Sequence, residues 1–277
     1  MATRVFCIGN GESRQSLDLR MFKPHGKIYG CNALYRDFTP DVLISVDHGI
    51  MHEIYHSGYC YKNECWFRDW TRLPDYMYES LVYAGMTPDQ ITESKKWDVI
   101  SENKKGKCNE FVMHGANLWG MVTILKKDDT KYKKNVNQNV LKVSWVGEDK
   151  VSNINDVMPN NVDIGWAAGP TSGYVATKKE DPTEIYLIGH DLNSNTKFVN
   201  NVYKDTVHYS MSKNQAIVSD NWITQWSLLF TENPHVKFYK VNQSLNGDEN
   251  VNKPVFEWKD IPNLKYIDYP GLLDKLQ

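Results

Sequence analysis

Three short apolar runs lie within the first fifty residues, and their spacing constrains the fold more than any other feature of the chain. They are RVFCIG at residues 4–9, GKIYGCNAL at 26–34 and DVLISVD at 41–47. Nearly continuous apolar strands are typical of parallel sheets, because helices cover both faces of such sheets. A helix is predicted between the first two runs, at SLDLRMF (16–22). We therefore predict an α/β fold with a mainly parallel sheet flanked by helices.

The rest of the chain continues this alternation. Strands are predicted at EIYLIGHDL (184–192) and VKFYKVN (236–242). Helices are predicted at RLPDYMYESLVYAGM (72–86), NEFVMHGANLWGMVTILKK (109–127), PTSGYVATKK (170–179) and NQAIVSDNWITQWSLLFTEN (214–233), the last of which closes at Pro234. No repeat or low-complexity linker divides the chain. We predict one domain over residues 1–245 and an irregular C-terminal extension, 246–277, packed on it.

Charge and composition restrict the classes of partner. The formal net charge is -2 and the pI is near 6.4, so no global basic field attracts nucleic acid. The most basic stretch, residues 126–142, is read as a solvated loop, with an anionic acceptor surface as the alternative. No apolar run is long enough to span a bilayer, and because the N-terminus leads directly into a predicted strand we expect no signal peptide.

The cysteines indicate the compartment. There are five, an odd number, and they are scattered; Cys7 and Cys31 lie in apolar strands and are predicted to be small buried residues. This usage is typical of a reducing environment, so we predict a cytoplasmic protein.

The loop after the first strand reads Gly9-Asn10-Gly11-Glu12-Ser13. A strand that ends in G-x-G ahead of a helix gathers backbone N–H groups at one point, which favours an anion. The loop alone fits a dinucleotide site, another phosphate site or a tight turn. Arg14 stands where the dinucleotide fingerprint needs a third glycine, and Asn32 stands where it needs a carboxylate, so NAD is disfavoured. The lysine of P-loop nucleotide hydrolases is also absent.

Three other segments carry polar side chains next to predicted strands or helices. GPTSGY (169–174) opens a helix, GHD (189–191) ends a strand, and VHYSMSKNQ (207–215) precedes the long helix. Open α/β sheets bind ligands at the carboxyl ends of their strands. Together with the glycine loop, these segments predict a nucleotide pocket.

These motifs resemble, in order and approximate spacing, those of the bacterial sialyltransferases of glycosyltransferase family 42. In that family the motifs read G-N-G-P-S, C-N, T-S-G, G-I-D, and H-Y followed by S-K-N. The matching residues here, spread over positions 4 to about 240, are Gly9 to Ser13, Cys31-Asn32, Thr171-Ser172-Gly173, Gly189-His190-Asp191, His208-Tyr209 and Ser212-Lys213-Asn214.

The resemblance implies a Rossmann-like domain that binds a nucleotide-sugar, with a small lid at about residues 192–210. It implies that Asn10, Asn32 and Ser172, with Thr171 and Gly173, contact the nucleotide, and that the backbone from Gly9 through Gly11 to Ser13 approaches its phosphate. Asp191 would tether the lid or a ribose, with N-capping as the alternative. His208 would be the general base, since an unperturbed imidazole titrates near neutral pH. His190 is its rival.

Two departures from the family pattern concern the phosphate. The two lid tyrosines that follow the G-I-D strand in the family are replaced by Asn193 and Phe198, and only Tyr203 follows. Stabilisation of the leaving phosphate is therefore expected from Lys197, from Tyr203 or from a metal at Asp47. Glu12 replaces proline and places a negative charge beside the expected phosphate.

A second resemblance covers PDVLISVDHG (40–49), which is similar to the P-D-x-x-x-S-x-D segment of the DUF115 proteins. That group contains flagellin-modifying glycosyltransferases and archaeal pterin pyrophosphokinases. The resemblance implies a ligand or metal contact for Asp47, with helix capping as the alternative. His48, His52 and His56 follow four residues apart, so on a helix they share one face, with Glu53 beside them. A metal site there and a row of exposed histidines both remain open.

The sequence thus predicts a glycosyltransferase that moves a sugar from a nucleotide-activated donor, a CMP-sugar or another, to an acceptor hydroxyl, with His208 and Asp47 as catalytic residues. The nucleotide-sugar is the co-substrate, and dependence on a divalent metal is open. The acceptor is a glycan, a protein or a modified nucleic acid. The alternatives are a pterin-type pyrophosphokinase and a non-catalytic nucleotide-binding module.

Overall fold

The structure is a computed structural model that describes residues 3–69, 110–114, 122–126, 143–147 and 166–277. The chain forms two compact units, and the boundary differs from the predicted one. The first unit joins residues 1–44 to 151–277, and the second contains residues 45–150. The predicted extension, 246–277, therefore belongs to the first unit.

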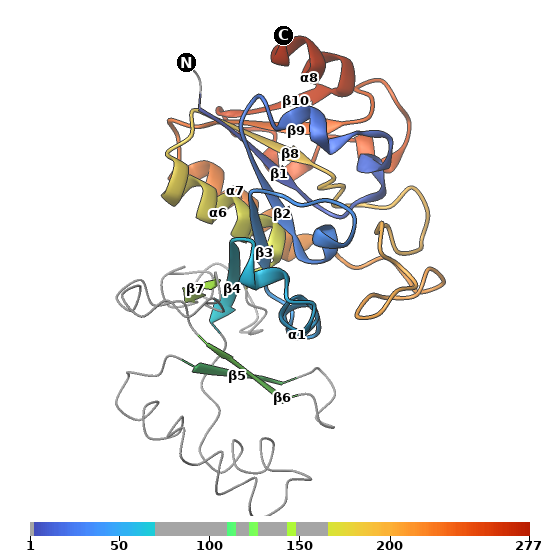
Figure 1. The fold of residues 1–277 in the computed structure, drawn as a ribbon. Helices are drawn as coiled ribbons and strands as arrows, with labels where there is room; N and C mark the ends of the chain where they lie inside the picture. The colour runs from blue at the N-terminus through green and yellow to red at the C-terminus, as the bar shows by residue number, and fades with distance from the viewer. Residues whose placement is uncertain (1–2, 70–109, 115–121, 127–142, 148–165) are drawn as a thin grey trace, which may run out of the picture. The chain divides into compact units, whose positions relative to one another are not determined.

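A parallel sheet forms the centre of the first unit. Its strands are β1 (Arg4–Ile8), β2 (Lys27–Cys31), β3 (Val42–Ser45, which reaches the unit boundary), β8 (Glu184–Ile188), β9 (Lys237–Asn242) and β10 (Leu264–Asp268). They lie in the order β10-β9-β8-β1-β2-β3, and each strand pairs in parallel with its neighbours (Figure 1). The prediction of an α/β, Rossmann-like fold is confirmed.

The strand order reverses direction between β1 and β8. From β1 the chain adds β2 and β3 on one side, and from β8 it adds β9 and β10 on the other. Where the loops after two adjacent strands run toward opposite sides of a sheet, a crevice forms at the carboxyl ends of these strands. Open α/β folds bind ligands in this crevice. The loops after Ile8 and Ile188 lie at this switch point.

Helices cover both faces of this sheet. On one face, Phe6 stacks between Phe22 and Tyr186, with ring centroids 4.9 and 5.1 Å away, and Lys275 of α8 (Tyr269–Leu276) lies over Tyr239. On the other face, α6 (Ala168–Glu180) packs on β1 and β2 and against α7 (Asp220–Glu232). Cys7 and Cys31 are free and buried, as predicted.

The predicted helix at 16–22 is replaced by two short 3₁₀ turns, η1 (Glu12–Ser16) and η2 (Leu19–Phe22). Leu17 is extended between them, and the Asp18 carboxylate accepts the Arg20 N–H at 3.0 Å. Such local side-chain to backbone bonds compete with a continuous helix. The long helix α7 also begins later than predicted, at Asp220, because Val199 donates to the Asn214 carbonyl and holds the preceding residues in a loop.

The C-terminal extension is regular, which corrects the prediction of an irregular tail. It contributes η7 (Asn250–Asn252), η8 (Phe256–Trp258), β10 and α8. Trp258 is buried against Phe230 with a centroid distance of 5.1 Å, and its Nε1–H donates to Ser227 Oγ at 2.9 Å. The Asn263 amide donates to the carbonyl oxygens of Phe230, Asn233 and Val236. These bonds join the end of α7 to the start of β10, which Asn263 directly precedes.

The second unit contains α1 (His48–His56), η4 (Tyr59–Tyr61), a parallel pair of strands, β4 (Cys65–Asp69) and β7 (Val143–Gly147), and an antiparallel pair, β5 (Glu110–His114) and β6 (Val122–Lys126). The last pair lies where a helix was predicted. Each of its two strands is only five residues long, a length at which periodicity does not separate strand from helix. The predicted helix at 72–86 and the basic stretch after Lys126 lie outside the described residues.

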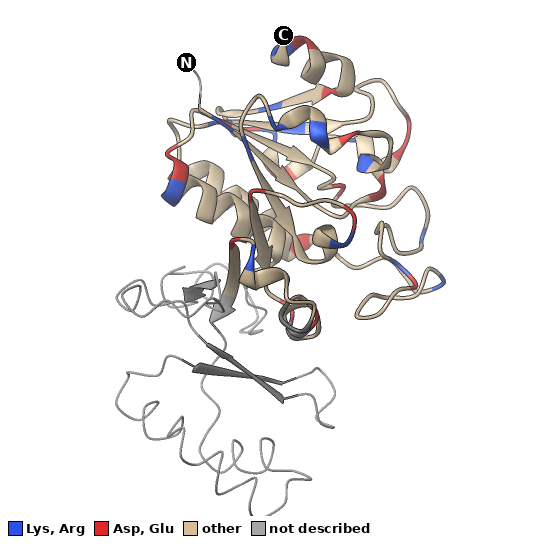
Figure 2. Ribbon diagram, in the orientation of Figure 1, with Lys and Arg blue, Asp and Glu red and all other residues tan. Residues whose placement is uncertain are grey.

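Charges of both signs are interspersed along the first unit (Figure 2), so its described residues form no large field of one sign. Among the helices that the structure describes, none has the length and hydropathy needed to cross a membrane.

We predict that Trp258→Ala lowers the free energy of unfolding by about 3–5 kcal/mol, because it leaves a large cavity beside Phe230. Phe256→Ala, in the same 3₁₀ turn but 72% exposed, is the matched control and is expected within about 0.5 kcal/mol of the wild type. Urea unfolding measures both. Equal losses in the two variants would contradict the packing described for the extension.

Candidate functional site

The loops that follow β1 and β8 are hydrogen-bonded to each other at the switch point. The Gly9 N–H donates to the Ile188 carbonyl and the Gly11 N–H to the Gly189 carbonyl, both at 2.8 Å. A Cβ on Gly9 would lie 2.5 Å from the Gly189 oxygen, so the close approach requires glycine. The glycines of the predicted phosphate loop therefore bring the two loops together.

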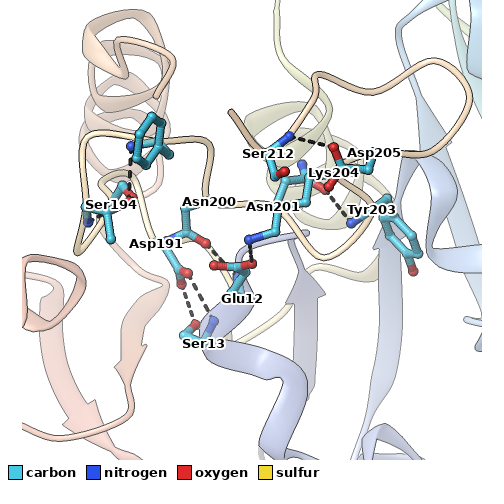
Figure 3. A network of polar contacts seen from close by, with 12 residues as sticks. Glu12, Ser13, Asp191, Ser194, Asn200, Asn201, Tyr203, Lys204, Asp205 and Ser212 are labelled. Carbon is cyan, nitrogen blue, oxygen red and sulfur yellow. Dashed lines mark hydrogen bonds and ion pairs between the residues drawn. The ribbon is translucent and has the colours of Figure 1, made fainter. Parts of the chain in front are cut away.

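Asp191 fills the start of η1. It is buried, and its carboxylate accepts hydrogen bonds from the Ser13 N–H (3.1 Å) and from the Ser13 hydroxyl (Figure 3). A Cβ on Gly11 would lie 2.4 Å from the Asp191 Cγ, so this glycine makes room for the carboxylate. The N–H groups that were predicted to face a phosphate thus donate within the protein, and any phosphate there would compete with Asp191.

Asn10 lies where β1 and β2 both end. Its Nδ2 donates to the Cys31 carbonyl at 3.2 Å and to the Tyr209 hydroxyl at 3.4 Å. The Ala33 N–H donates to the same hydroxyl at 3.2 Å. The Asn10 Oδ1 is buried and has no hydrogen-bond partner among the described residues. Two donors and one acceptor therefore converge next to Asn32, which is half-buried and has a left-handed backbone (φ 50°) that asparagine tolerates.

The segment from 192 to 219, called here the β8–α7 segment, contains the predicted lid. It contacts the glycine loop at several points that Figure 3 shows from close by. The Val202 N–H donates to the Asn10 carbonyl, the Asn200 Oδ1 accepts the Glu12 N–H, both at 2.8 Å, and Lys204 forms an ion pair with the Glu12 carboxylate. Glu12, whose charge conflicts with an adjacent phosphate, is thus an anchor for this segment.

Arg14 and Tyr203 form a second connection to the segment. Arg14 Nη2 donates to the Tyr203 hydroxyl at 2.8 Å, and this hydroxyl donates to Asp37 Oδ1 at 2.6 Å. Burial raises the pKa of the Tyr203 phenol well above its ordinary 10, against the opposing effect of the Arg14 cation. The phenol therefore stays protonated and can donate to Asp37.

Arg36 also contacts this segment. Its Nη1 donates to Thr206 Oγ1 at 2.7 Å and its Nη2 to the Val207 carbonyl at 3.1 Å. Sequence reasoning missed Arg36 and Asp37, and it used Arg14 only to argue against NAD. No local pattern marks them, since their partners lie at least 160 residues away in sequence.

His208, the predicted base, is exposed and has a left-handed backbone (φ 68°). It directly precedes Tyr209, whose hydroxyl contacts Asn10. The structure thus places the backbone of His208 at the rim of the site. Lys197, the other candidate of this segment, is exposed, with its Nζ 5.3 Å from the Phe198 ring centroid.

His190, the rival base, is buried between the sheet and the helices. Its Nε2 lies 3.1 Å from the Cys7 carbonyl, and its ring meets Trp226 edge to face. Burial, together with the smaller effect of the Lys240 ammonium, lowers the pKa of His190 from 6.5 to about 3. The Nε2–H of the neutral ring therefore donates to the carbonyl. A base of this pKa accepts a proton poorly near neutral pH, so His190 is better suited to holding the loops in place.

The three residues of the T-S-G motif lie at the start of α6 and are all buried. Ser172 donates to the Gly169 carbonyl at 2.6 Å. A Cβ on Gly173 would lie 2.6 Å from the Trp226 ring, so this glycine lets α6 and α7 pack closely. Both residues serve packing, whereas the Thr171 Oγ1 is buried without a hydrogen-bond partner among the described residues.

Asp47 belongs to the second unit. It is exposed and directly precedes α1, where its carbonyl accepts the Met51 N–H at 3.0 Å. His48, His52 and His56 fall within α1, but their side chains lie outside the described part. Within the part that is described, no three His, Cys, Asp or Glu side chains are grouped closely enough to hold a metal ion. The ligand and metal predictions for Asp47 stay predictions.

Comparison of the chain with protein-family models, with curated proteins and with solved structures finds no match. The arguments for function therefore rest on the geometry of the site and on the motifs of the sequence.

We predict that acid destabilises the protein through His190. Below pH 6.5 the unfolded chain binds a proton at this residue, whereas the folded chain binds it only near pH 3. The free energy of unfolding therefore falls as the pH drops through this window, by up to about 1.4 kcal/mol per pH unit. Urea unfolding between pH 4.5 and 7 should show a shallower pH dependence in His190→Gln. An unchanged slope would show that His190 is already charged in the folded protein.

Proposed function

We propose that this protein is a glycosyltransferase that moves a sugar from a nucleotide-activated donor, a CMP-sugar or another, to an acceptor hydroxyl. The observation that carries the proposal is the convergence at the switch point. There the Asn10 side chain and the Ala33 N–H meet the His208-Tyr209 pair of the β8–α7 segment. The contact between Asn10 and Tyr209, which are 199 positions apart in sequence, supports a site that combines the proposed nucleotide residues with the neighbouring His208.

The nucleotide contacts come from side chains more than from the loop backbone. Asn10 and Thr171 each have a buried oxygen that lacks a hydrogen-bond partner among the described residues, and Asn32 adjoins Ala33. A nucleoside offers donors and acceptors on its base and ribose that would satisfy such atoms. Ser172 and Gly173 are not included in this proposed site, because both are buried in helix packing.

The transfer is a single displacement with inversion. His208 takes the proton of the acceptor hydroxyl while that oxygen attacks the anomeric carbon. The bond from the anomeric carbon to the phosphate oxygen breaks, and its electron pair leaves with the nucleotide phosphate. The β8–α7 segment bears the base, and Glu12, Arg14 and Arg36 position this segment through their contacts with Lys204, Tyr203 and Thr206.

We predict that His208→Asn lowers sugar transfer by about 10²–10⁴-fold, the range typical of general-base catalysis. The matched control is His235→Asn, which changes an exposed histidine beyond the end of α7 and should retain wild-type activity. Donor consumption is measured over a panel of CMP-, UDP- and GDP-sugars with glycan and protein acceptors. Full activity in His208→Asn would exclude it as the base.

A pyrophosphokinase is the second candidate, because Asp47 stands between the end of β3 and the start of α1 within the DUF115-like segment. This function requires ATP and Mg²⁺ and transfers a diphosphate to a hydroxyl. We predict that, if it holds, AMP release from ATP depends on Mg²⁺ and is lost in Asp47→Asn. Nucleotide binding without turnover of any sugar donor or of ATP would identify a non-catalytic binding module instead.

A further inference from the structure

Arg14 crosses the switch point with a buried side chain. Its stem passes Gly189, since a Cβ on that glycine would lie 3.1 Å from the Arg14 Cδ. Its guanidinium reaches Tyr203 and Asp37, and Asp37 follows η3 (Asn32–Arg36), the turn after β2. The side chain thus spans from the end of β8 toward the end of β2, along the sheet edge where ligands bind in open α/β folds.

The charge of Arg14 is only partly compensated. Its side chain is 5% exposed, and its nearest carboxylate, Asp37, lies 3.8 Å away and is 49% exposed. Of its five N–H groups, only one on Nη2 donates to a described residue, and Nε is buried with no partner among these residues. The carboxylates of Asp191 and Glu12 are already bound to Ser13 and Lys204. Buried cations are usually paired and fully hydrogen-bonded. The unused N–H groups and the charge of Arg14 therefore favour the binding of a further anion.

We propose that Arg14 binds a phosphate group of the nucleotide ligand, and that a phosphate oxygen takes the place of the Tyr203 hydroxyl on Nη2. This inference rests on the proposed function and names the residue that receives the phosphate. A guanidinium suits this task because its fork of N–H groups matches two phosphate oxygens at once. It also supplies N–H donors to the leaving phosphate in place of the missing lid tyrosines, since the Ser13 N–H already donates to Asp191.

The Tyr203 hydroxyl makes two hydrogen bonds, and the binding of phosphate to Arg14 replaces only one of them. It accepts from Arg14 and donates to Asp37. When phosphate replaces it on Arg14, the bond to Asp37 remains and the tyrosine keeps its place in the segment. Removal of the hydroxyl therefore frees the Arg14 donor for phosphate, whereas removal of the guanidinium eliminates the phosphate contact.

The experiment measures binding by calorimetry with the full chain. The probes are CMP, UMP, GMP and AMP, the four parent nucleosides, and inorganic pyrophosphate. The variants are Arg14→Gln and Tyr203→Phe, with Arg20→Gln as the control. Arg20 also carries a guanidinium, but its side chain is 80% exposed and paired with Asp18 at 2.7 Å on η2. Thermal melting of each variant establishes that it is folded.

The proposal expects Arg14→Gln to weaken the best-bound monophosphate by about 10- to 100-fold, the usual effect of a lost charge-assisted hydrogen bond. Its parent nucleoside should change by less than about twofold. Tyr203→Phe should bind the monophosphate as tightly as the wild type or more tightly, and Arg20→Gln should match the wild type.

If Arg14 only fastens the β8–α7 segment, Arg14→Gln weakens nucleotide and nucleoside by the same factor and Tyr203→Phe reproduces that loss. Either result overturns the proposal, as does the absence of binding by any nucleotide and by pyrophosphate. If Arg14→Gln does not fold, the comparison of Tyr203→Phe with the wild type still decides between the two roles. Phosphate discrimination by Arg14 in a chain that transfers no sugar would keep this inference and reject the glycosyltransferase function.

Discussion

The hydrogen bonds between Asp191 and Ser13 are the interaction on which the rest of the site depends. They join the loop after β8 to the loop after β1, although the two residues are 178 positions apart in sequence. Gly11 leaves room for the carboxylate, and the buried Lys240 ammonium lies near enough for the Asp191 charge to favour it. The first two N–H groups of η1 are occupied, since that of Glu12 donates to Asn200 and that of Ser13 to Asp191. A ligand at this edge must therefore be recognised by side chains.

The β8–α7 segment is attached to the same loops. Polar contacts tie it to the first loops of the chain, among them Glu12 with Lys204, Glu12 with Asn200, Arg14 with Tyr203, and Arg36 with Thr206. Three of these involve a charged group, so directional bonds hold the segment in addition to the buried side chains of Val199 and Tyr203. Such contacts exchange readily for those of a charged ligand, which suits a segment that bears the predicted base beside the Tyr209 hydroxyl.

The predictions from sequence succeeded where the local pattern is unambiguous. The continuous apolar runs around Phe6, Ile28, Ile44, Leu187 and Phe238 are all strands of the parallel sheet, because full burial on both faces leaves a clear mark. The pattern failed for 109–127, where two five-residue strands were read as one helix, and for the C-terminal tail. In that tail, the strand β10 is only half-buried and its residues alternate weakly.

For the site, the sequence placed Asn10, Asp191 and Tyr209 near one sheet edge, and the structure brings Asn10 and Tyr209 into contact. The sequence did not show that Ser172 and Gly173 are buried in the packing of α6. Which side of this helix is buried depends on the elements that pack against it, and these are remote in sequence.

The amino-acid order alone determined the alternation of strands and helices, the parallel sheet, and the polar loops at the strand ends. Each of these depends on neighbours within a few residues. The tertiary structure decided which loop meets which: that Glu12 pairs with Lys204, that Arg14 reaches Tyr203, and that Asp191 and not a ligand fills the start of η1. These pairings follow from the strand order β8-β1-β2, which sets the distances between residues that are remote in sequence. The residues around each partner contain no pattern that indicates this order.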